Sequence, residues 1–202
     1  LALEARLAPI IGDHAKGHTD EPRAHRPLPV VAVEGAMDGH EDVVGQVIAS
    51  QRDGIFLATK VSGSHLRRDQ VLRAADASLR LLNTDYIDLY QIHWPNRGVP
   101  VAETMSAMES LVDDGLVKYV GVSNFSLDDL QAAQQAMVHH PIVSNQVLYN
   151  LKDRGIERAL LPYCQEQGIT IIAYTPLADG SLAKQSSFSL DRRGAVLAQI
   201  AD

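Results

Sequence analysis

Between residues 42 and 174 the sequence alternates two kinds of apolar pattern, and this alternation restricts the folds open to the chain more than any other feature. One pattern is a short, almost continuously apolar run, which is typical of strands buried on both faces of a parallel sheet. Such runs occupy residues 55–60, 86–93, 117–122, 142–147 and 169–174. A helix-containing segment separates each run from the next, so the pattern predicts an α/β protein with a parallel sheet.

The intervening segments carry the periodicity and the end signals of helices. Residues 66–82 keep their apolar side chains on one helical side. Ser126, with Asp129 three positions later, approximates a capping box at the start of another helix. Residues 155–168 are predicted to form a single helix that Gly168 closes.

Composition restricts the partners and the compartment. The chain has 202 residues and a net charge of −7, which argues against nucleic acid as a partner because phosphate binding needs a basic excess. The single cysteine, Cys164, cannot form an intramolecular disulfide, so a reducing, cytoplasmic location is expected. Glu4 and Arg6 interrupt the apolar start of the chain, so no signal peptide and no membrane segment is predicted.

Polar or aromatic side chains stand at the carboxyl end of every predicted strand. They are Lys60, His93, Ser123 with Asn124, Gln146 and Tyr174. In a closed (β/α)8 barrel these ends converge on one mouth, where active sites are built, whereas an open doubly wound sheet would spread them along an edge. The convergence of chemically useful residues favours the barrel, and periodicity alone leaves both architectures open.

Side-chain alternation predicts which residues point inward. If His93 faces the barrel interior, Leu89 shares that side, whereas Tyr90 faces the helices. By the same parity Lys60 faces inward together with Phe56. Taken singly, each strand-end residue also has a structural explanation, such as a solvated strand end, a helix cap or a satisfied buried amide. The conjunction of five such ends favours a functional site.

Five motifs resemble the aldo-keto reductase family, in that family's order and spacing. They are "IFLATKV", "SLRLLNTDYIDLYQIHWP", "AMESLVDDGLVKYVGVSNFS", "NQVLYNL" and "GITIIAYTPLADG". The resemblance covers about residues 41–182. It implies a (β/α)8 barrel that binds a nicotinamide dinucleotide, usually NADPH, and transfers hydride to the carbonyl of an aldehyde or ketone. NADH is the alternative cofactor.

The resemblance also implies roles for individual residues. Lys60 matches the active-site lysine, His93 matches the histidine that orients the substrate carbonyl, and Trp94 would line the substrate pocket. The cofactor residues comprise three that hold the nicotinamide carboxamide, one that stacks on the ring and two in the following loop. They are Ser123, Asn124, Gln146, Tyr174, Thr175 and Leu177.

The N-terminal part departs from the family pattern. The family's proton-donor tyrosine and its partner aspartate belong to this region, but the first tyrosine of the chain is Tyr86. Glu34 or Asp38 remains as a charged partner for Lys60. Residues 1–40 lack the expected strand and glycine-rich patterns, so they are interpreted as a divergent, flexible segment, and residues 41–202 as a partial barrel of about strands 3–7 without strand 8. The irregularly placed histidines of the N-terminal segment predict no metal site.

Three functional hypotheses follow. The first is an NAD(P)H-dependent oxidoreductase for aldehydes and ketones that is impaired because the proton donor is absent. The second is a non-catalytic dinucleotide-binding or regulatory relative, and the third is a lyase that uses Lys60 as a Schiff-base nucleophile. The chain is expected to be either a truncated piece with an altered start or a natural degenerate relative. Uncovered barrel edges predict self-association.

Overall fold

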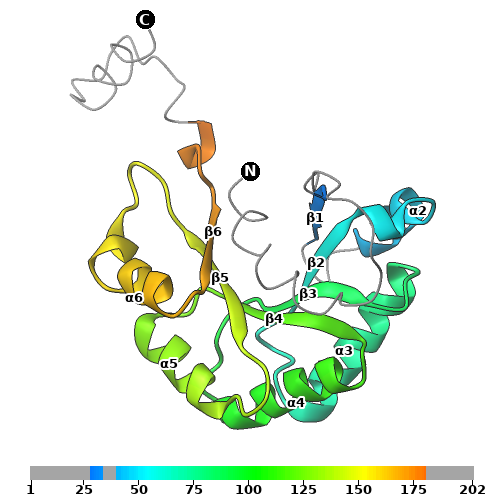
Figure 1. The fold of residues 1–202 in the computed structure, drawn as a ribbon, viewed down its shortest axis with the longest axis horizontal. Helices are drawn as coiled ribbons and strands as arrows, with labels where there is room; N and C mark the ends of the chain where they lie inside the picture. Colours follow the sequence, from blue (N-terminus) through cyan, green and yellow to red (C-terminus); the bar gives the residue numbers. More distant parts are fainter. Residues whose placement is uncertain (1–27, 34–39, 181–202) are drawn as a thin grey trace, which may run out of the picture.

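Six parallel strands, each hydrogen-bonded to the next in sequence order, form one curled sheet in the computed structural model (Figure 1). The structure describes residues 28–33 and 40–180. The strands are β1 (Val30–Ala32), β2 (Phe56–Val61), β3 (Ile87–Ile92), β4 (Val117–Ser123), β5 (Ile142–Leu148) and β6 (Thr170–Tyr174). The helices are α2 (Glu41–Ile48), α3 (Arg68–Leu81), α4 (Val101–Asp113), α5 (Leu127–Ala136) and α6 (Leu160–Glu166), with short 3-10 helices η1 (Arg52–Gly54), η2 (Gly155–Arg158) and η3 (Ala178–Gly180).

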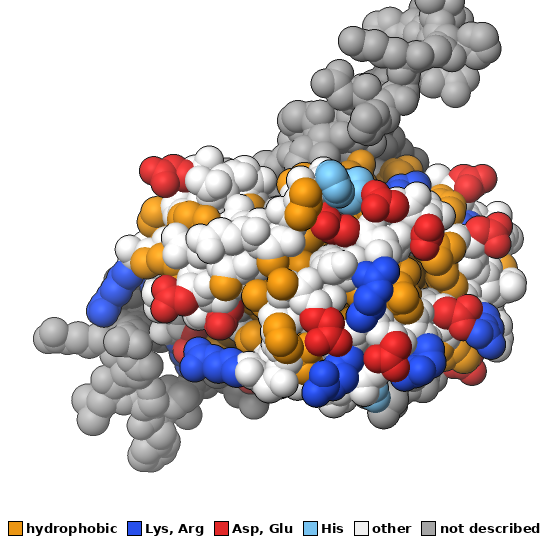
Figure 2. Space-filling view, turned by 90° about the horizontal axis from the view of Figure 1, so that it is seen from below, with side chains coloured by type: hydrophobic (Ala, Val, Ile, Leu, Met, Phe, Trp, Pro, Cys, Tyr) orange, Lys and Arg blue, Asp and Glu red, His pale blue; other side chains and the backbone are white. Residues whose placement is uncertain are grey.

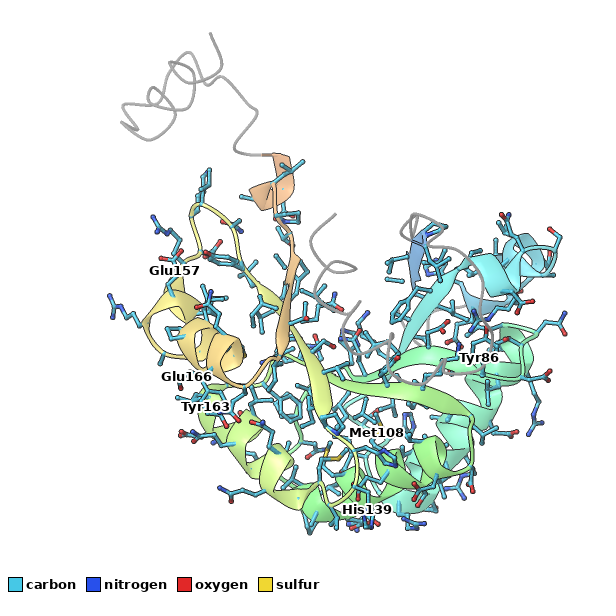
Figure 3. All side chains as sticks on the ribbon, viewed as in Figure 1. Tyr86, Met108, His139, Glu157, Tyr163 and Glu166 are labelled. Carbon is cyan, nitrogen blue, oxygen red and sulfur yellow. The ribbon has the colours of Figure 1, made fainter. Side chains whose placement is uncertain are left out.

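The helices lie on the convex side of the sheet (Figure 1). Met108 of α4 lies between its helix and the sheet, in the main apolar core (Figure 3). A strand order that follows the sequence, with the helices on one side, differs from a doubly wound sheet, whose strand order reverses and whose helices cover both faces. It is the arrangement of a (β/α)8 barrel, so the prediction of an α/β fold of the barrel type, present in part, is confirmed.

The predicted inward and outward faces of the strands are confirmed. Phe56, Ala58 and Leu89 form an apolar cluster on the concave side, and Tyr90 and Ile92 belong to the core beneath the helices. Acidic and basic side chains are interspersed with apolar ones over the outer, helix-covered face (Figure 2). Within the described ranges, no helix has the length and apolar character needed to cross a membrane.

One row of inward-facing residues crosses the sheet just below the strand ends. Lys60 is in register with Gln91, Gln91 with Gly121, and Gly121 with Ser144. A Cβ at Gly121 would overlap the Ser144 hydroxyl and lie 3.0 Å from Cγ of Gln91. The register shifts between Val120 and Gly121, an irregularity that accommodates one extra residue on β5. This shift brings Ser123 opposite Gln146.

Several local expectations hold, and others need correction. Ser126 accepts a hydrogen bond from the Asp129 amide at 3.2 Å in the expected capping box, and Gly168 has the positive φ of a helix-ending residue. The helix predicted over residues 155–168 is instead divided into η2 and α6 at Ala159, whose φ of −143° is not helical.

The N-terminal region supplies a second correction. The sequence pattern placed no strand before residue 55, but β1 pairs in parallel with β2 through Val30 and Phe56. A run of three residues is too short for a two-residue alternation to be recognised. Glu34, Asp38 and the N-terminal histidines lie outside the described residues.

Candidate active site

Asn124 links the ends of three strands through its side chain. Its amide nitrogen donates to the main-chain oxygen of His93 at 3.0 Å and to the Ser123 hydroxyl at 3.1 Å. Its amide oxygen accepts from the Tyr174 hydroxyl at 2.9 Å. The ends of β3, β4 and β6 are therefore joined at one side chain, which brings together four residues that the sequence predicted for the site.

The backbone of Asn124 suits this position. Its φ is 61°, in the left-handed region that asparagine tolerates better than most residues. Its N–H donates to the main-chain oxygen of Gln146 at 2.9 Å, so the turn after β4 is held against β5. The sequence predicted a polar residue here, but a left-handed residue cannot be recognised from strand alternation.

Ser123 and Gln146 lie side by side on neighbouring strands. The Ser123 hydroxyl donates to the main-chain oxygen of Gln146 at 2.8 Å. The side chain of Ser123 is buried, whereas Gln146 is half-buried. Within the described residues the side-chain amide of Gln146 makes no hydrogen bond, so it offers both a donor and an acceptor at the strand ends.

Lys60 is buried in β2, with 3% of its surface exposed. It was expected at the end of this strand, but the strand continues to Val61. Its Nζ lies 3.4 Å from the main-chain oxygen of Val33, just beyond β1. A lysine buried to this extent is exceptional in proteins unless it is paired or functional, and it lies one strand away from His93 on the same inner face of the sheet.

His93 and Trp94 follow β3 directly. The His93 N–H donates to the main-chain oxygen of Val61 at 2.9 Å, which continues the pairing of β3 with β2 by one residue. The ring of His93 is half-buried and lies 6.3 Å from the Trp94 ring, at 36° between the ring planes. Trp94 itself is 52% exposed, so its indole is open to solvent at the strand ends.

The loop after β6 contains residues in uncommon backbone conformations. Thr175 has a φ of 53°, which is unfavourable for a β-branched residue. Its main-chain oxygen accepts from the amide of Asn150 at 3.1 Å. Leu177, also predicted for the cofactor loop, is 68% exposed. Conformational strain of this kind is concentrated at functional sites.

Asn150 is a residue of this region that the sequence did not single out. Its amide oxygen accepts from the N–H groups of Lys152 and Asp153 at 2.8 and 2.9 Å. The same side chain therefore folds the loop after β5 and binds the loop after β6. An asparagine before a run of turn-forming residues was the only available signal, and it indicates a local turn without naming the distant partner.

The six tyrosines all lie within the described residues, and their surroundings are defined. Three hydroxyls donate to side chains: Tyr149 to Glu157, Tyr163 to Gln134 and Tyr174 to Asn124. Tyr90 is fully buried among the helices, where burial raises the pKa of its hydroxyl. Tyr119 stacks on Phe56, and Tyr86 lies beneath Arg52, far from the α6 arm that carries Tyr163 (Figure 3). None of these interactions directs a tyrosine hydroxyl to Lys60.

The sequence of the chain is similar to those of known proteins. A sequence model of the aldo/keto reductase family matches residues 37–195. Methylglyoxal reductase YeaE of Escherichia coli (strain K12) is 43% identical over 140 residues, which make up 69% of this chain and 49% of that protein. Aldo-keto reductase YhdN of Bacillus subtilis (strain 168) is 38% identical over 152 residues, which make up 70% of this chain and 45% of that protein.

Solved structures give the same result. An aldo/keto reductase from Klebsiella pneumoniae, in complex with NADP and acetate, has a TM-score of 0.73 and 38% sequence identity over 87% of this chain and 61% of that one. Another solved structure of an aldo-keto reductase from Klebsiella pneumoniae, in complex with NADPH, has a TM-score of 0.71 and 40% identity over 79% of this chain and 56% of that one. The chain spans about half the length of the curated relatives it matches. The family model and the relatives agree with the five motifs and with the parallel sheet, and the chain belongs to the aldo/keto reductase family.

Proposed function

We propose that this chain descends from NADPH-dependent oxidoreductases. It converts small aldehydes or ketones to alcohols, but more slowly than a complete enzyme of this kind. The observation that carries the proposal is the hydrogen-bonded group at the strand ends, in which Asn124 joins His93, Ser123 and Tyr174. Membership of the aldo/keto reductase family supports the reaction class. When bound, the dinucleotide would supply the hydride.

The hydrogen-bond donors and acceptors left over in the site match those of a carboxamide group. Both hydrogens of the Asn124 amide are used, and its oxygen keeps one lone pair after accepting from Tyr174. The Ser123 hydroxyl likewise keeps one lone pair. Gln146 offers an amide N–H that has no partner in the described residues. The site thus has acceptors for an amide NH2 and a donor for an amide oxygen, which are the two halves of a nicotinamide carboxamide.

His93 and Lys60 are proposed to act on the carbonyl. The backbone of His93 is fixed through its N–H and its carbonyl oxygen, so the half-buried imidazole starts from a defined place beside the carboxamide residues. An N–H donor at this position would orient a carbonyl oxygen and stabilise the negative charge that develops on it. The buried ammonium group of Lys60 would add positive potential on the same face.

The proposed reduction in rate depends on the missing proton donor. The hydroxyls of Tyr149, Tyr163 and Tyr174 donate to side chains of the protein and not toward a substrate carbonyl. The other three tyrosine rings lie among the helices or near the amino ends of the strands. The loss of a general acid lowers a rate by about 10²- to 10⁴-fold. A non-catalytic dinucleotide-binding protein is the second candidate, because the carboxamide residues need no tyrosine.

Steady-state oxidation of NADPH with methylglyoxal, followed by absorbance, tests the proposed reaction. This small aldehyde is chosen because one relative is named as a methylglyoxal reductase. We expect slow turnover that His93→Ala abolishes, well below the ordinary enzyme value of about 10 per second. A turnover number near that value would refute the impairment. Saturable NADPH binding without any turnover would favour the non-catalytic candidate.

Two further properties are proposed. Within the described residues, β1 and β6 each pair with one strand only, which leaves backbone groups on their outer edges available to another chain. Self-association is therefore proposed, and light scattering that shows a monomer at all concentrations would refute it. The buried, unpaired Cys164, whose burial raises its thiol pKa to about 11, is compatible with the proposed cytoplasmic location.

A further inference from the structure

Asn96 cross-links the turns that follow β2 and β3. Its amide nitrogen donates to the main-chain oxygen of Gly63 at 2.9 Å. Its amide oxygen accepts from the N–H of Gly98 at 2.9 Å, so the same side chain also closes its own turn. The two turns begin directly after β2, which carries Lys60, and after β3, which His93 follows, so Asn96 connects the ends of these two strands.

Gly63 provides an independent sign of the same contact. A Cβ at this position would lie 2.8 Å from the main-chain oxygen of Trp94 and 3.1 Å from its Cβ. Since real Cβ atoms do not approach backbone atoms to 2.8 Å, only glycine allows the two turns to touch here. The absence of a side chain at Gly63 thus lets the backbone of Trp94 pack against it, and the Asn96 hydrogen bond holds the two turns together.

The Trp94 ring lies near His93 of the proposed site. Its ring lies 6.3 Å from the ring of His93 and is 52% exposed. An indole this exposed gains little from burial in the core, so the backbone that carries it determines where the side chain starts. The contact of this backbone with Gly63, and the hydrogen bond from Asn96 to Gly63, hold that starting point in place.

We propose that Asn96 and Gly63 are positioning residues that fix Trp94 beside His93 and thereby set the width of the carbonyl pocket. Bulky carbonyl substrates would depend on the fixed indole, whereas small aldehydes would not reach it. The effect on substrates rests on the proposed reductase function. The fixing of Trp94 is a property of the chain alone and does not depend on that function.

Trp94 is the only tryptophan of the chain, so its fluorescence reports this turn directly. Asn96→Asp keeps an acceptor for Gly98 but removes the donor to Gly63. Gly63→Ala adds a Cβ that prevents the close packing of the two turns. In the cofactor-free protein, both variants should show a larger fast component of the Trp94 anisotropy decay and stronger acrylamide quenching. The matched control is Ser64→Ala, in the same exposed turn, whose hydroxyl hydrogen-bonds to Ser62 and His65 alone among the residues that the structure describes. Unchanged anisotropy in both turn variants would overturn the proposal.

The kinetic part compares a phenyl-substituted aldehyde with a three-carbon aldehyde. In Asn96→Asp the KM for the bulky aldehyde should rise about threefold to tenfold, the range for one lost hydrogen bond, while the KM for the small one changes less than about twofold. An equal change for both aldehydes would overturn the pocket role. If the wild-type chain does not oxidise NADPH, the reductase function fails, and the anisotropy alone then decides whether Asn96 and Gly63 position Trp94.

Discussion

The two ends of the parallel strands use polar residues in opposite ways. At the amino ends, Asp88 accepts hydrogen bonds from Arg52, Lys118 and the N–H of Leu57 at 2.8 to 2.9 Å. The ring of Tyr86 lies 3.9 Å from the charged groups of both Arg52 and Lys118. Three further N–H groups of Arg52 donate to the Thr84 hydroxyl and to the main-chain oxygens of Ile55 and Tyr86. This end is a mutually hydrogen-bonded cluster in which the single carboxylate of Asp88 pairs with two cationic side chains.

At the carboxyl ends, polar side chains are held in place but keep hydrogen-bonding capacity that the described residues do not fill. Gln146 makes no side-chain hydrogen bond within the described residues, and Trp94 is exposed. Asn124 and Thr175 both have positive φ values. From this difference we infer that the parallel sheet separates stability at one end from the proposed site at the other, as in a barrel whose active site is built at one end. The predictions below test that separation.

The largest effect is expected at the amino ends. Asp88→Ala should lower the free energy of unfolding by about 3 kcal/mol or more, because it leaves Arg52 charged with only 12% of its side chain exposed and without its carboxylate. Urea unfolding measures the loss. Asp69→Ala, which removes an exposed i,i+4 pair with Arg73, is the matched control and should cost less than about 0.5 kcal/mol. Equal losses would contradict the assignment of stability to this end.

Asn150→Ala is expected to have the next largest effect. It removes the acceptor for two turn N–H groups and the donor to the main-chain oxygen of Thr175. We expect a loss of about 2 kcal/mol in the free energy of unfolding, since a largely buried amide with several partners is lost. Hydrogen exchange should localise the change to residues 150–153 and 175–178. Protection that falls evenly across the sheet would contradict a local role.

Asn124 allows backbone strain and side-chain bonding to be separated. Asn124→Gly accepts the φ of 61° and loses only the amide, whereas Asn124→Ala also places a Cβ in a left-handed conformation. Alanine should therefore be about 1 kcal/mol less stable than glycine at this position. Thermal unfolding of the two variants checks the difference, and alanine as the more stable variant would contradict the described turn.

The smallest effect concerns a carboxyl group outside the site. Glu41 is buried and accepts from the Thr59 hydroxyl at 2.7 Å, and burial raises the pKa of its carboxyl above 4.5 in the folded state. The folded chain then binds more protons than the unfolded chain, so stability falls as pH rises from 4.5 through the raised pKa. Glu41→Gln should remove this contribution to the slope and gain about 0.5 kcal/mol at pH 8. Urea unfolding from pH 4 to 8 tests it, and an unchanged slope would contradict the prediction.

The parts of the fold that depend on repeating patterns were predictable from the sequence. Two-residue alternation placed Leu89 inside and Tyr90 outside, and the strand ends gathered Ser123, Asn124 and Gln146 as expected. These follow from local geometry, because parallel strands repeat one direction and one period.

The parts that depend on distant partners were not predictable. The register shift beside Gly121 arises from packing across two strands, and β1 becomes a strand only because β2 pairs with it. The bond between Asn150 and Thr175 joins residues 25 positions apart. The cross-link between Asn96 and Gly63 likewise joins two turns that carry no shared sequence pattern.

Binding of NADPH by Gln146→Ala tests the central claim most directly. The Gln146 side chain has no partner within the described residues, so its removal should leave the free energy of unfolding unchanged. Fluorescence titration should nevertheless show affinity about tenfold weaker than that of the wild-type chain, as for one lost hydrogen bond to the carboxamide. The exposed Gln165 of α6, changed to alanine, is the control and should bind like the wild type. Wild-type affinity in Gln146→Ala, or no saturable binding by the wild-type chain, would contradict a nicotinamide site at the carboxyl ends of the strands.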